Sequence, residues 1–138
     1  MARQLILDTN ALIAYERATF DTTALDDDDL AIAAITVAEF RVGIELARTA
    51  TQAADRARVL AVILDVVTVL DYTERTATEH ARLLAHVRQS GTPRGAHDLI
   101  IAAQAAEHGR TLVSLDARAR FGDLPGVNAL DPLSDHRG

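Results

Sequence analysis

The sequence predicts an α/β fold in which a central, mainly parallel sheet carries helices on both faces. Short apolar runs alternate along the chain with longer segments of helical periodicity, and the connections between them are brief. The apolar runs are almost uninterrupted, which is typical of parallel strands that are buried on both faces. We therefore expect one domain spanning residues 1–138, with a polar tail at 131–138.

The first elements form a strand–helix–strand series. Residues 3–7 are apolar and predict a buried strand, and residues 11–18 predict a short helix. The polar segment 21–29 ends in four consecutive Asp residues, and such a run of like charge is typical of a solvated loop. Residues 30–33 predict a second short buried strand.

Three helices and a strand are expected in the middle of the chain. A helix that begins at Thr36 has apolar residues at 3.6-residue spacing, and a second helix is expected over 53–64. Residues 66–70 are rich in β-branched side chains, which favours a strand. Residues 74–89 predict a helix with one apolar face.

The last third begins with a loop at 90–95, where Ser, Gly, Thr and Pro form the densest group of turn-forming residues. An apolar helix runs from His97 or Asp98 to Glu107, and Gly109 suits its left-handed cap. The remaining elements are, in order, a strand at 111–115, a helical turn at 118–121 and a strand at 127–130.

The composition excludes several kinds of site and partner. There is no Cys, so a metal would be bound by oxygen or imidazole ligands. The net charge of −6 argues against non-specific attraction to nucleic acid, although all 14 basic side chains are Arg, which pairs well with phosphate. No apolar run approaches the ~20 residues needed to cross a bilayer, and the N-terminus lacks a signal-peptide pattern. We expect a cytoplasmic protein without a membrane partner.

Four acidic residues stand where an α/β fold presents side chains to a ligand. Asp8 and Asp116 each follow an apolar run, and Glu39 and Asp98 stand near the start of an expected helix. In a parallel sheet such positions lie at the carboxyl edge, where ligands bind. Two like charges ~4 Å apart repel by roughly 4 kcal/mol at an effective dielectric of about 20, so four clustered carboxylates need a cation. The pattern predicts a divalent-metal site.

Asp8 and Glu39 also have simpler structural explanations. The sequence from Asp8 to Asn10 suits helix capping, and Asn10 can cap the helix while Asp8 points into the crevice. Thr36-x-x-Glu39 matches a capping box, which taken alone favours a capping role for Glu39.

Asp98 and Asp116 have structural alternatives too. An acid in the first turn of a helix is stabilised by the helix dipole, and Asp is a common turn former. His97 has no partner at helical spacing, so it is not counted as a ligand. A shared site is favoured because all four acids are expected at the same edge of one sheet.

Four segments of the chain, taken in order, match one known family. They are Ile6–Asn10, Ile35–Phe40, Asp98–Ala103 and Thr111–Asp116. Through them the chain resembles a PIN domain, specifically the VapC-type toxin ribonucleases of bacterial toxin–antitoxin pairs. The resemblance implies a PIN-like three-layer α/β/α sandwich with a central mainly parallel sheet of four or five strands.

The resemblance also implies an activity and partners. PIN toxins of this type are Mg²⁺- or Mn²⁺-dependent endoribonucleases that cleave structured RNA such as tRNA. They are usually homodimers, and a small VapB-like antitoxin with its own DNA-binding domain neutralises them.

The resemblance assigns site residues by position. The acids of the family correspond to Asp8, Glu39, Asp98 and Asp116, and Thr9 and Ser114 stand where the family often has a small hydroxyl or amide. This chain departs from the pattern at His97 and lacks a further acid just after Asp116. Candidates for holding the RNA backbone are Arg41, Arg94, Arg118 and Arg120.

Other functions are less consistent with these residues. A haloacid-dehalogenase-like phosphatase needs a second Asp where this chain has Asn10, and both that family and receiver domains need a Lys, which is absent. The alternative that remains is a degenerate PIN domain that binds protein or RNA without catalysis.

Overall fold

The computed structural model describes residues 2–18, 22–116 and 119–131. Its strands are β1 (Gln4–Leu7), β2 (Asp29–Ala33), β3 (Thr68–Leu70), β4 (Thr111–Val113) and β5 (Ala129–Leu130). Its α-helices are α1 (Thr9–Arg17), α2 (Ala34–Glu45), α3 (Ala50–Val66), α4 (Glu74–Ser90) and α5 (Ala96–His108). Short 3₁₀ helices lie at Thr22–Leu25 and Phe121–Asp123.

The five strands form one parallel sheet in the order β3-β2-β1-β4-β5. From β1 the chain first adds β2 and β3 on one side and then crosses over to add β4 and β5 on the other. The direction of winding therefore reverses between β1 and β4. In open α/β sheets the ligand crevice lies at such a reversal, outside the carboxyl ends of the strands.

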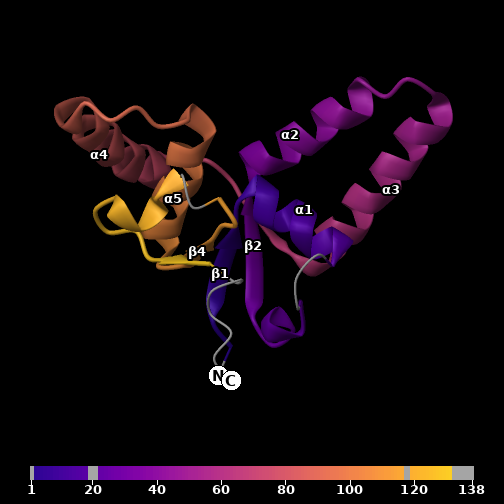
Figure 1. The fold of residues 1–138 in the computed structure, drawn as a ribbon, viewed down its shortest axis with the longest axis horizontal. Coiled ribbons are helices and arrows are strands. Elements are labelled where there is room, and N and C mark those ends of the chain that lie inside the picture. Colours follow the sequence, from indigo (N-terminus) through magenta and orange to yellow (C-terminus); the bar gives the residue numbers. More distant parts are fainter. Residues whose placement is uncertain (1, 19–21, 117–118, 132–138) are drawn as a thin grey trace.

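Helices cover both faces of the sheet, because successive side chains of a strand point to opposite faces. In β1, Leu5 and Leu7 pack into the core shared with α1 and α3, whereas Ile6 packs into the core shared with α4 and α5. Figure 1 shows α4 and α5 on one side of the sheet and α1 and α3 on the other. The predicted three-layer α/β/α sandwich with a central, mainly parallel sheet of four or five strands is confirmed. The sheet has five strands, and all of its neighbouring pairs are parallel.

The helices α2 and α3 pack against each other and extend together beyond the end of β2 (Figure 1). The expectation of a strand from residue 66 is wrong for the first two positions, since α3 continues through Val66 and β3 begins at Thr68. A helix propagates cooperatively once formed, and this outweighs the weak strand preference of β-branched residues near its end.

The amino edge of the sheet is held by ion pairs. Arg110, buried just before β4, donates to the backbone oxygens of Leu5 and Asp29 at 3.1 Å and to the Asp29 carboxylate at 3.2 Å. The Arg3 side chain pairs with Asp28 at 2.8 Å. The expectation that the aspartates of segment 21–29 are simply solvated is therefore wrong for Asp28 and Asp29, because both have cationic partners.

The remaining boundaries differ by a few residues from those expected. The strands expected to end at residue 115 and to begin at residue 127 are shorter, since β4 ends at Val113 and β5 begins at Ala129. Of the helical turn expected at 118–121, Arg118 lies outside the described residues, as does the tail from residue 132. None of the helices within the described ranges combines the length and apolar character needed to cross a bilayer.

Candidate functional site

Asp8 lies at the carboxyl end of β1, directly before α1. It is the N-cap of α1, and its Oδ1 accepts a hydrogen bond from the Ala11 amide at 2.8 Å. The expectation that Asn10 caps this helix is therefore wrong, because the helix already begins at Thr9. Burial raises the pKa of the Asp8 carboxyl, hydrogen bonds from Ser114 and Ala11 lower it, and the charges of Asp98 and Asp116 raise it again.

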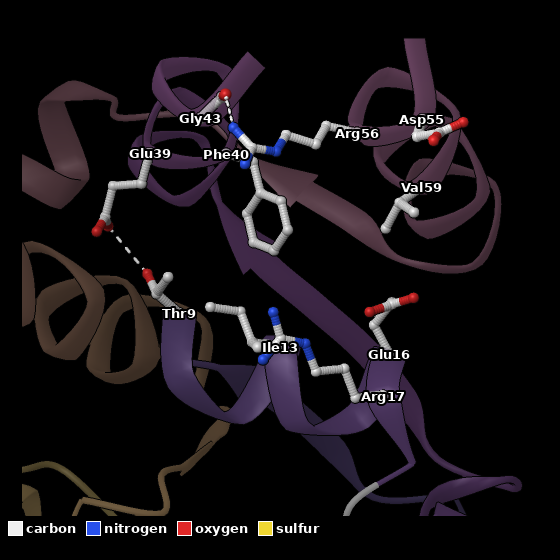
Figure 2. A pocket seen from close by; sticks show the side chains of 10 residues that line it. All are labelled: Thr9, Ile13, Glu16, Arg17, Glu39, Phe40, Gly43, Asp55, Arg56 and Val59. Carbon is white, nitrogen blue, oxygen red and sulfur yellow. Dashed lines mark hydrogen bonds between the residues drawn. The ribbon is translucent and has the colours of Figure 1, made fainter. Parts of the chain in front are cut away.

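Glu39 lies in the second turn of α2 and not in a capping box. The helix begins at Ala34 after an N-cap, Ala33, that makes no side-chain cap bond, and Thr36 is buried. Glu39 Oε1 instead accepts a hydrogen bond from the Thr9 hydroxyl at 2.9 Å, as Figure 2 shows, and lies 3.5 Å from His97 Nδ1. Glu39 therefore contacts Thr9 of α1, which follows Asp8 in the sequence, and His97 of α5, which precedes Asp98.

Asp98 stands in the first turn of α5, whose N-cap is Gly95. Burial is the main cause that raises the pKa of the Asp98 carboxyl, and the charges of Asp116 and Glu39 raise it further. His97 and Arg94 oppose this shift. The Cβ of any larger residue at position 95 would lie 3.1 Å from Asp98 Oδ2, so Gly95 leaves room for this carboxylate.

Asp116 follows β4 and lies beside Ser114. The Asp116 amide donates to Ser114 Oγ at 3.1 Å, and the buried Ser114 hydroxyl is bonded to the Asp8 carboxylate. A cavity of about 250 Å³ opens here, lined by Ser114, Asp116, Arg120, Phe121, Gly122, Ala129, Leu130 and Asp131. Ser114 thus connects the acids that follow the two strands on either side of the winding reversal.

The structure brings the four predicted acids to the carboxyl edge of the sheet, where they act on one another electrostatically. Asp8 is influenced by Asp98 and Asp116, and Asp98 by Asp116 and Glu39. Across residues 2–18, 22–116 and 119–131, however, no three His, Asp or Glu side chains are already close enough to hold a metal ion together.

The chemistry of this donor set fits a hard divalent cation. All four candidates are carboxylates, and burial with mutual repulsion disfavours the charged forms of Asp8 and Asp98. Mg²⁺ prefers oxygen ligands and keeps several of its waters, so one or two direct carboxylate ligands are enough. The carboxylates are too far apart to surround a metal ion with protein atoms alone. This spacing is compatible with a Mg²⁺ ion that keeps several waters and binds one or two carboxylates directly.

A larger cavity of about 500 Å³ lies between α1 and the α2–α3 pair (Figure 2). Ile13, Phe40 and Val59 supply apolar surface, and charged side chains from α1 and α3 lie around them. Among the described residues, its lining is Thr9, Ile13, Glu16, Arg17, Glu39, Phe40, Gly43, Asp55, Arg56 and Val59. The cavity therefore begins at the hydrogen-bonded pair Thr9–Glu39, beside the acids. Neither its shape nor its depth was evident from the sequence, since it depends on how α2 and α3 pack.

The four candidate arginines are in different environments. Arg41 and Arg120 are exposed, whereas Arg94 is half-buried and bonded to two backbone oxygens. Arg118 lies outside the described residues. The sequence offered no signal for the contacts of Arg94, because its partners lie 25 and 26 residues further along the chain.

Comparison with known proteins identifies the family. The family model for the PIN domain matches residues 5–126, which is most of the chain. The chain belongs to the PIN-domain family. This match includes all four acids together with Thr9 and Ser114, so the PIN resemblance seen in the sequence is confirmed.

Individual PIN-domain relatives give the same picture. The chain is 35% identical over 111 residues to Ribonuclease VapC5 of Mycobacterium tuberculosis, covering 80% of this chain and 82% of that protein. It is 27% identical over 133 residues to a Ribonuclease VapC of Rickettsia bellii, covering 95% and 98%. A crystal structure of VapBC-5 from M. tuberculosis matches with a TM-score of 0.75 and 31% identity, over 91% of this chain and 96% of that chain. DNA-bound VapBC from Salmonella typhimurium matches with a TM-score of 0.82 and 25% identity, over 96% and 99%.

Proposed function

We propose that this PIN-domain protein is a Mg²⁺- or Mn²⁺-dependent endoribonuclease and the toxin of a toxin–antitoxin pair. The observation that carries the proposal is the convergence of Asp8, Glu39, Asp98 and Asp116 at the winding reversal of the sheet. The similarity to proteins named VapC ribonucleases supports RNA as the substrate. A structured RNA such as a tRNA is the substrate class we favour.

Asp8 and Asp98 are the residues that we expect to bind the metal most directly, with Glu39 and Asp116 completing the shell directly or through water. When bound, the cation lowers the pKa of a water molecule and stabilises negative charge on the phosphate oxygens. A carboxylate of the group accepts the proton of the attacking water. Because water attacks, and not the 2′-hydroxyl of the RNA, the expected products carry a 5′-phosphate and a 3′-hydroxyl.

The neighbouring side chains orient these carboxylates. Ser114 holds Asp8, and Thr9 holds Glu39 Oε1. Asp8 also caps α1, which fixes its Oδ1 against the Ala11 amide. The carboxylates are therefore attached to three helices and two strand ends before any ligand arrives, which lowers the cost of ordering them when substrate binds.

The experiment that tests this function compares the wild type with Asp98→Asn. RNA from cells expressing each protein is sequenced from its 5′-monophosphate ends, and the purified proteins are incubated with that RNA in Mg²⁺, in Mn²⁺ and in EDTA. We expect new 5′-monophosphate ends for the wild type alone, and cleavage in vitro only with metal. Cleavage that persists in EDTA would exclude the metal mechanism. RNA binding without cleavage would instead support the degenerate, non-catalytic PIN domain.

We further propose that a VapB-like antitoxin binds in the cavity between α1 and the α2–α3 pair. Its apolar surface at Ile13 and Phe40, surrounded by charges of both signs, suits an amphipathic peptide segment better than a nucleic acid. Because the cavity begins at Glu39, an Arg of that segment can reach the acids and replace the cation.

This partner is tested with Phe40→Asp and the cognate antitoxin. We expect the variant to lose antitoxin affinity by at least about tenfold, since a charge replaces the aromatic side chain that supplies apolar surface to the cavity, while RNA cleavage continues. Titration of metal against antitoxin variants without Arg tests whether an antitoxin Arg replaces the cation. Inhibition that is unchanged after removal of every antitoxin Arg would rule out replacement of the cation.

A homodimer is the assembly that we propose for the toxin. The helix α3 and the edge strand β3 expose Val62, Val66 and Val69, which are apolar side chains of the kind that such an interface buries. Sedimentation equilibrium of the wild type and of Val66→Asp measures the assembly. A wild type that stays monomeric at high concentration would contradict this proposal.

A further inference from the structure

Arg94 joins two segments that carry acids of the candidate site. It precedes Gly95, the N-cap of the helix in which Asp98 lies. Its Nη1 donates to the carbonyl oxygens of Ala119 and Arg120, the second at 3.0 Å. One guanidinium therefore connects the start of α5 with the backbone that follows Asp116.

The two carbonyls belong to residues 119–123, a segment that is hydrogen-bonded back to Asp116. The Ala119 amide donates to the Asp116 carbonyl at 3.1 Å, and the Asp123 amide donates to the Arg120 carbonyl at 3.0 Å. Arg120 has a φ of 44°, a left-handed conformation that is uncommon for residues other than Gly. Such a conformation persists only where the surroundings hold it, and the Arg94 bonds are part of that support.

The contacts continue from Asp116 to the centre of the site. The Asp116 amide donates to Ser114 Oγ at 3.1 Å, and the Ser114 hydroxyl is bonded to Asp8. A continuous series of bonds therefore leads from Arg94 through Asp116 and Ser114 to Asp8. Loss of Arg94 would free one end of this series, while the other end remains attached to β1 and β4.

Arg94 and Arg120 differ in what their guanidinium groups can do. Arg94 is half-buried, and its Nη1 is used by backbone oxygens. The Arg120 side chain is 59% exposed, forms a surface ion pair with Asp123 at 3.3 Å, and lines the cavity next to Asp116. An exposed ion pair of this kind is weak, so Arg120 can exchange Asp123 for a phosphate.

We propose that Arg94 is a positioning residue for the nuclease site and not an RNA contact: it holds the backbone of residues 119–123 against α5, so that Asp98 and Asp116 face the same phosphate. This inference rests on the proposed ribonuclease function. It also separates two of the four arginines that the sequence alone placed in one group, since Arg120 remains the RNA contact.

The test applies one substitution at three arginines. Arg94→Met, Arg120→Met and, as a control on the exposed surface of α4, Arg88→Met are assayed for kcat and KM on the RNA that the wild type cleaves, over a range of NaCl concentrations. We expect Arg94→Met to lower kcat about 10- to 100-fold with an unchanged salt dependence of KM, because small misplacements of reacting groups have effects of this size. Arg120→Met should raise KM and reduce the slope of log KM against log[NaCl] by about 0.7, as expected for one lost phosphate contact. Arg88→Met should match the wild type.

Two outcomes of these assays would overturn the proposal. If Arg94→Met has a normal kcat but a reduced slope of log KM against log[NaCl], Arg94 is a phosphate contact. If kcat and the slope are both normal, Arg94 has no role in catalysis or in RNA binding. If Arg94→Met does not fold, Arg94→Lys retains the charge but not the planar fork of donors, and the same loss of kcat is expected of it.

A second measurement does not depend on catalysis. Amide hydrogen exchange at Ala119 and Asp123 should accelerate in Arg94→Met, with exchange in β1 unchanged. If the wild type cleaves no RNA, the proposed function fails, yet this measurement still reports whether Arg94 holds the segment. Unchanged exchange at both amides would contradict the positioning role.

Discussion

At the scale of single residues, Glu39 depends on its neighbours for its direction. It projects from α2, a helix that extends away from the sheet, and its carboxylate is turned towards the other acids by Thr9 and His97. Thr9 follows Asp8 directly, so one hydroxyl connects the acid after β1 with the acid on α2.

We predict that Thr9→Val lowers kcat about fivefold, since the net value of such a hydrogen bond is about 1 kcal/mol. Thr9→Ser keeps the hydroxyl and should restore the rate. The matched control is Thr78→Val on α4, where the hydroxyl donates to the Glu74 carbonyl oxygen of its own helix. Steady-state RNA cleavage measures all three, and equal rates for Thr9→Val and Thr9→Ser would show that the hydroxyl does not matter.

Asp98→Asn should stabilise the metal-free protein while reducing cleavage by at least about 100-fold, since a proposed metal ligand is lost. The stabilisation follows from the raised pKa of Asp98. The folded state then binds this proton more tightly than the unfolded state, so wild-type stability falls as pH rises from the ordinary value of 3.8 through the folded value. The gain in Tm should be present at pH 7 and absent below pH 3.8.

The control for this pH dependence is Asp28→Asn, for which the sign is opposite. Hydrogen bonding to Arg3 lowers the pKa of Asp28, so its stabilisation is present above the ordinary value and is lost as pH falls through the lowered value. Asp28→Asn should therefore lower Tm at pH 7. A scan of Tm against pH in EDTA distinguishes the two variants, and a drop in Tm for both would show that Asp98 is not under electrostatic strain.

The sequence allowed the positions of the acids to be predicted, but not the way in which each is held. Asp8 and Asp116 follow strands because apolar runs are visible in the sequence. For Glu39 the capping-box pattern was misleading, since α2 begins two residues before Thr36 and the Thr36 side chain is buried. That burial depends on tertiary packing, which a local motif does not encode.

At the scale of elements, the glycines of this fold have two different roles. Gly109 ends α5 at a φ of 63°, where its amide bonds back to the helix. Gly43 lies within α2, and a Cβ there would meet nothing within 4 Å. The same change to Ala should therefore have opposite effects at the two positions.

We predict that Gly109→Ala destabilises the protein by about 1 kcal/mol, because the left-handed conformation is strained for Ala. Gly43→Ala should stabilise it by about 0.5–1 kcal/mol, through the better helix propensity of Ala. Urea unfolding of both variants measures the free energies. A loss of stability in Gly43→Ala would indicate that α2 is not a regular helix in solution.

Element types were predicted well where the pattern was long and periodic, as in α4, and less well at the ends of elements. The sequence near Val66 shows the reason. Val66 and Val67 are β-branched, yet the last turn of α3 includes Val66, because the helix continues as far as its hydrogen bonds do. Which of the two preferences prevails is decided by the neighbours in space.

At the scale of the whole molecule, the two edges of the sheet are opposite in character. At the amino edge, Arg3 and Arg110 neutralise Asp28 and Asp29. At the carboxyl edge, the acids that follow β1 and β4 share one region with acids on α2 and α5, and burial together with the charges of neighbouring acids raises the pKa of Asp8 and Asp98. Stability is therefore concentrated at one edge, and electrostatic strain at the other.

We predict that this strain makes the stability of the whole protein depend on metal. A cation that binds only the folded state raises Tm, by an amount equivalent to about 2.7 kcal/mol at a concentration 100 times its Kd. Mg²⁺ or Mn²⁺ should raise Tm for the wild type and much less for Asp98→Asn, as measured by calorimetry against EDTA. Equal shifts in both proteins would place the bound ion elsewhere.

Asp8 both caps α1 and belongs to the candidate metal site, and this affects which substitution should be used to make an inactive variant. One of its oxygens closes the first turn of α1, so Asp8→Ala would unravel a helix start as well as remove a charge. A loss of toxicity in Asp8→Ala could then result either from misfolding or from the loss of the carboxylate at the candidate site. Asn retains an oxygen that can accept the capping hydrogen bond, so Asp8→Asn removes the charge at the site while leaving the start of α1 capped.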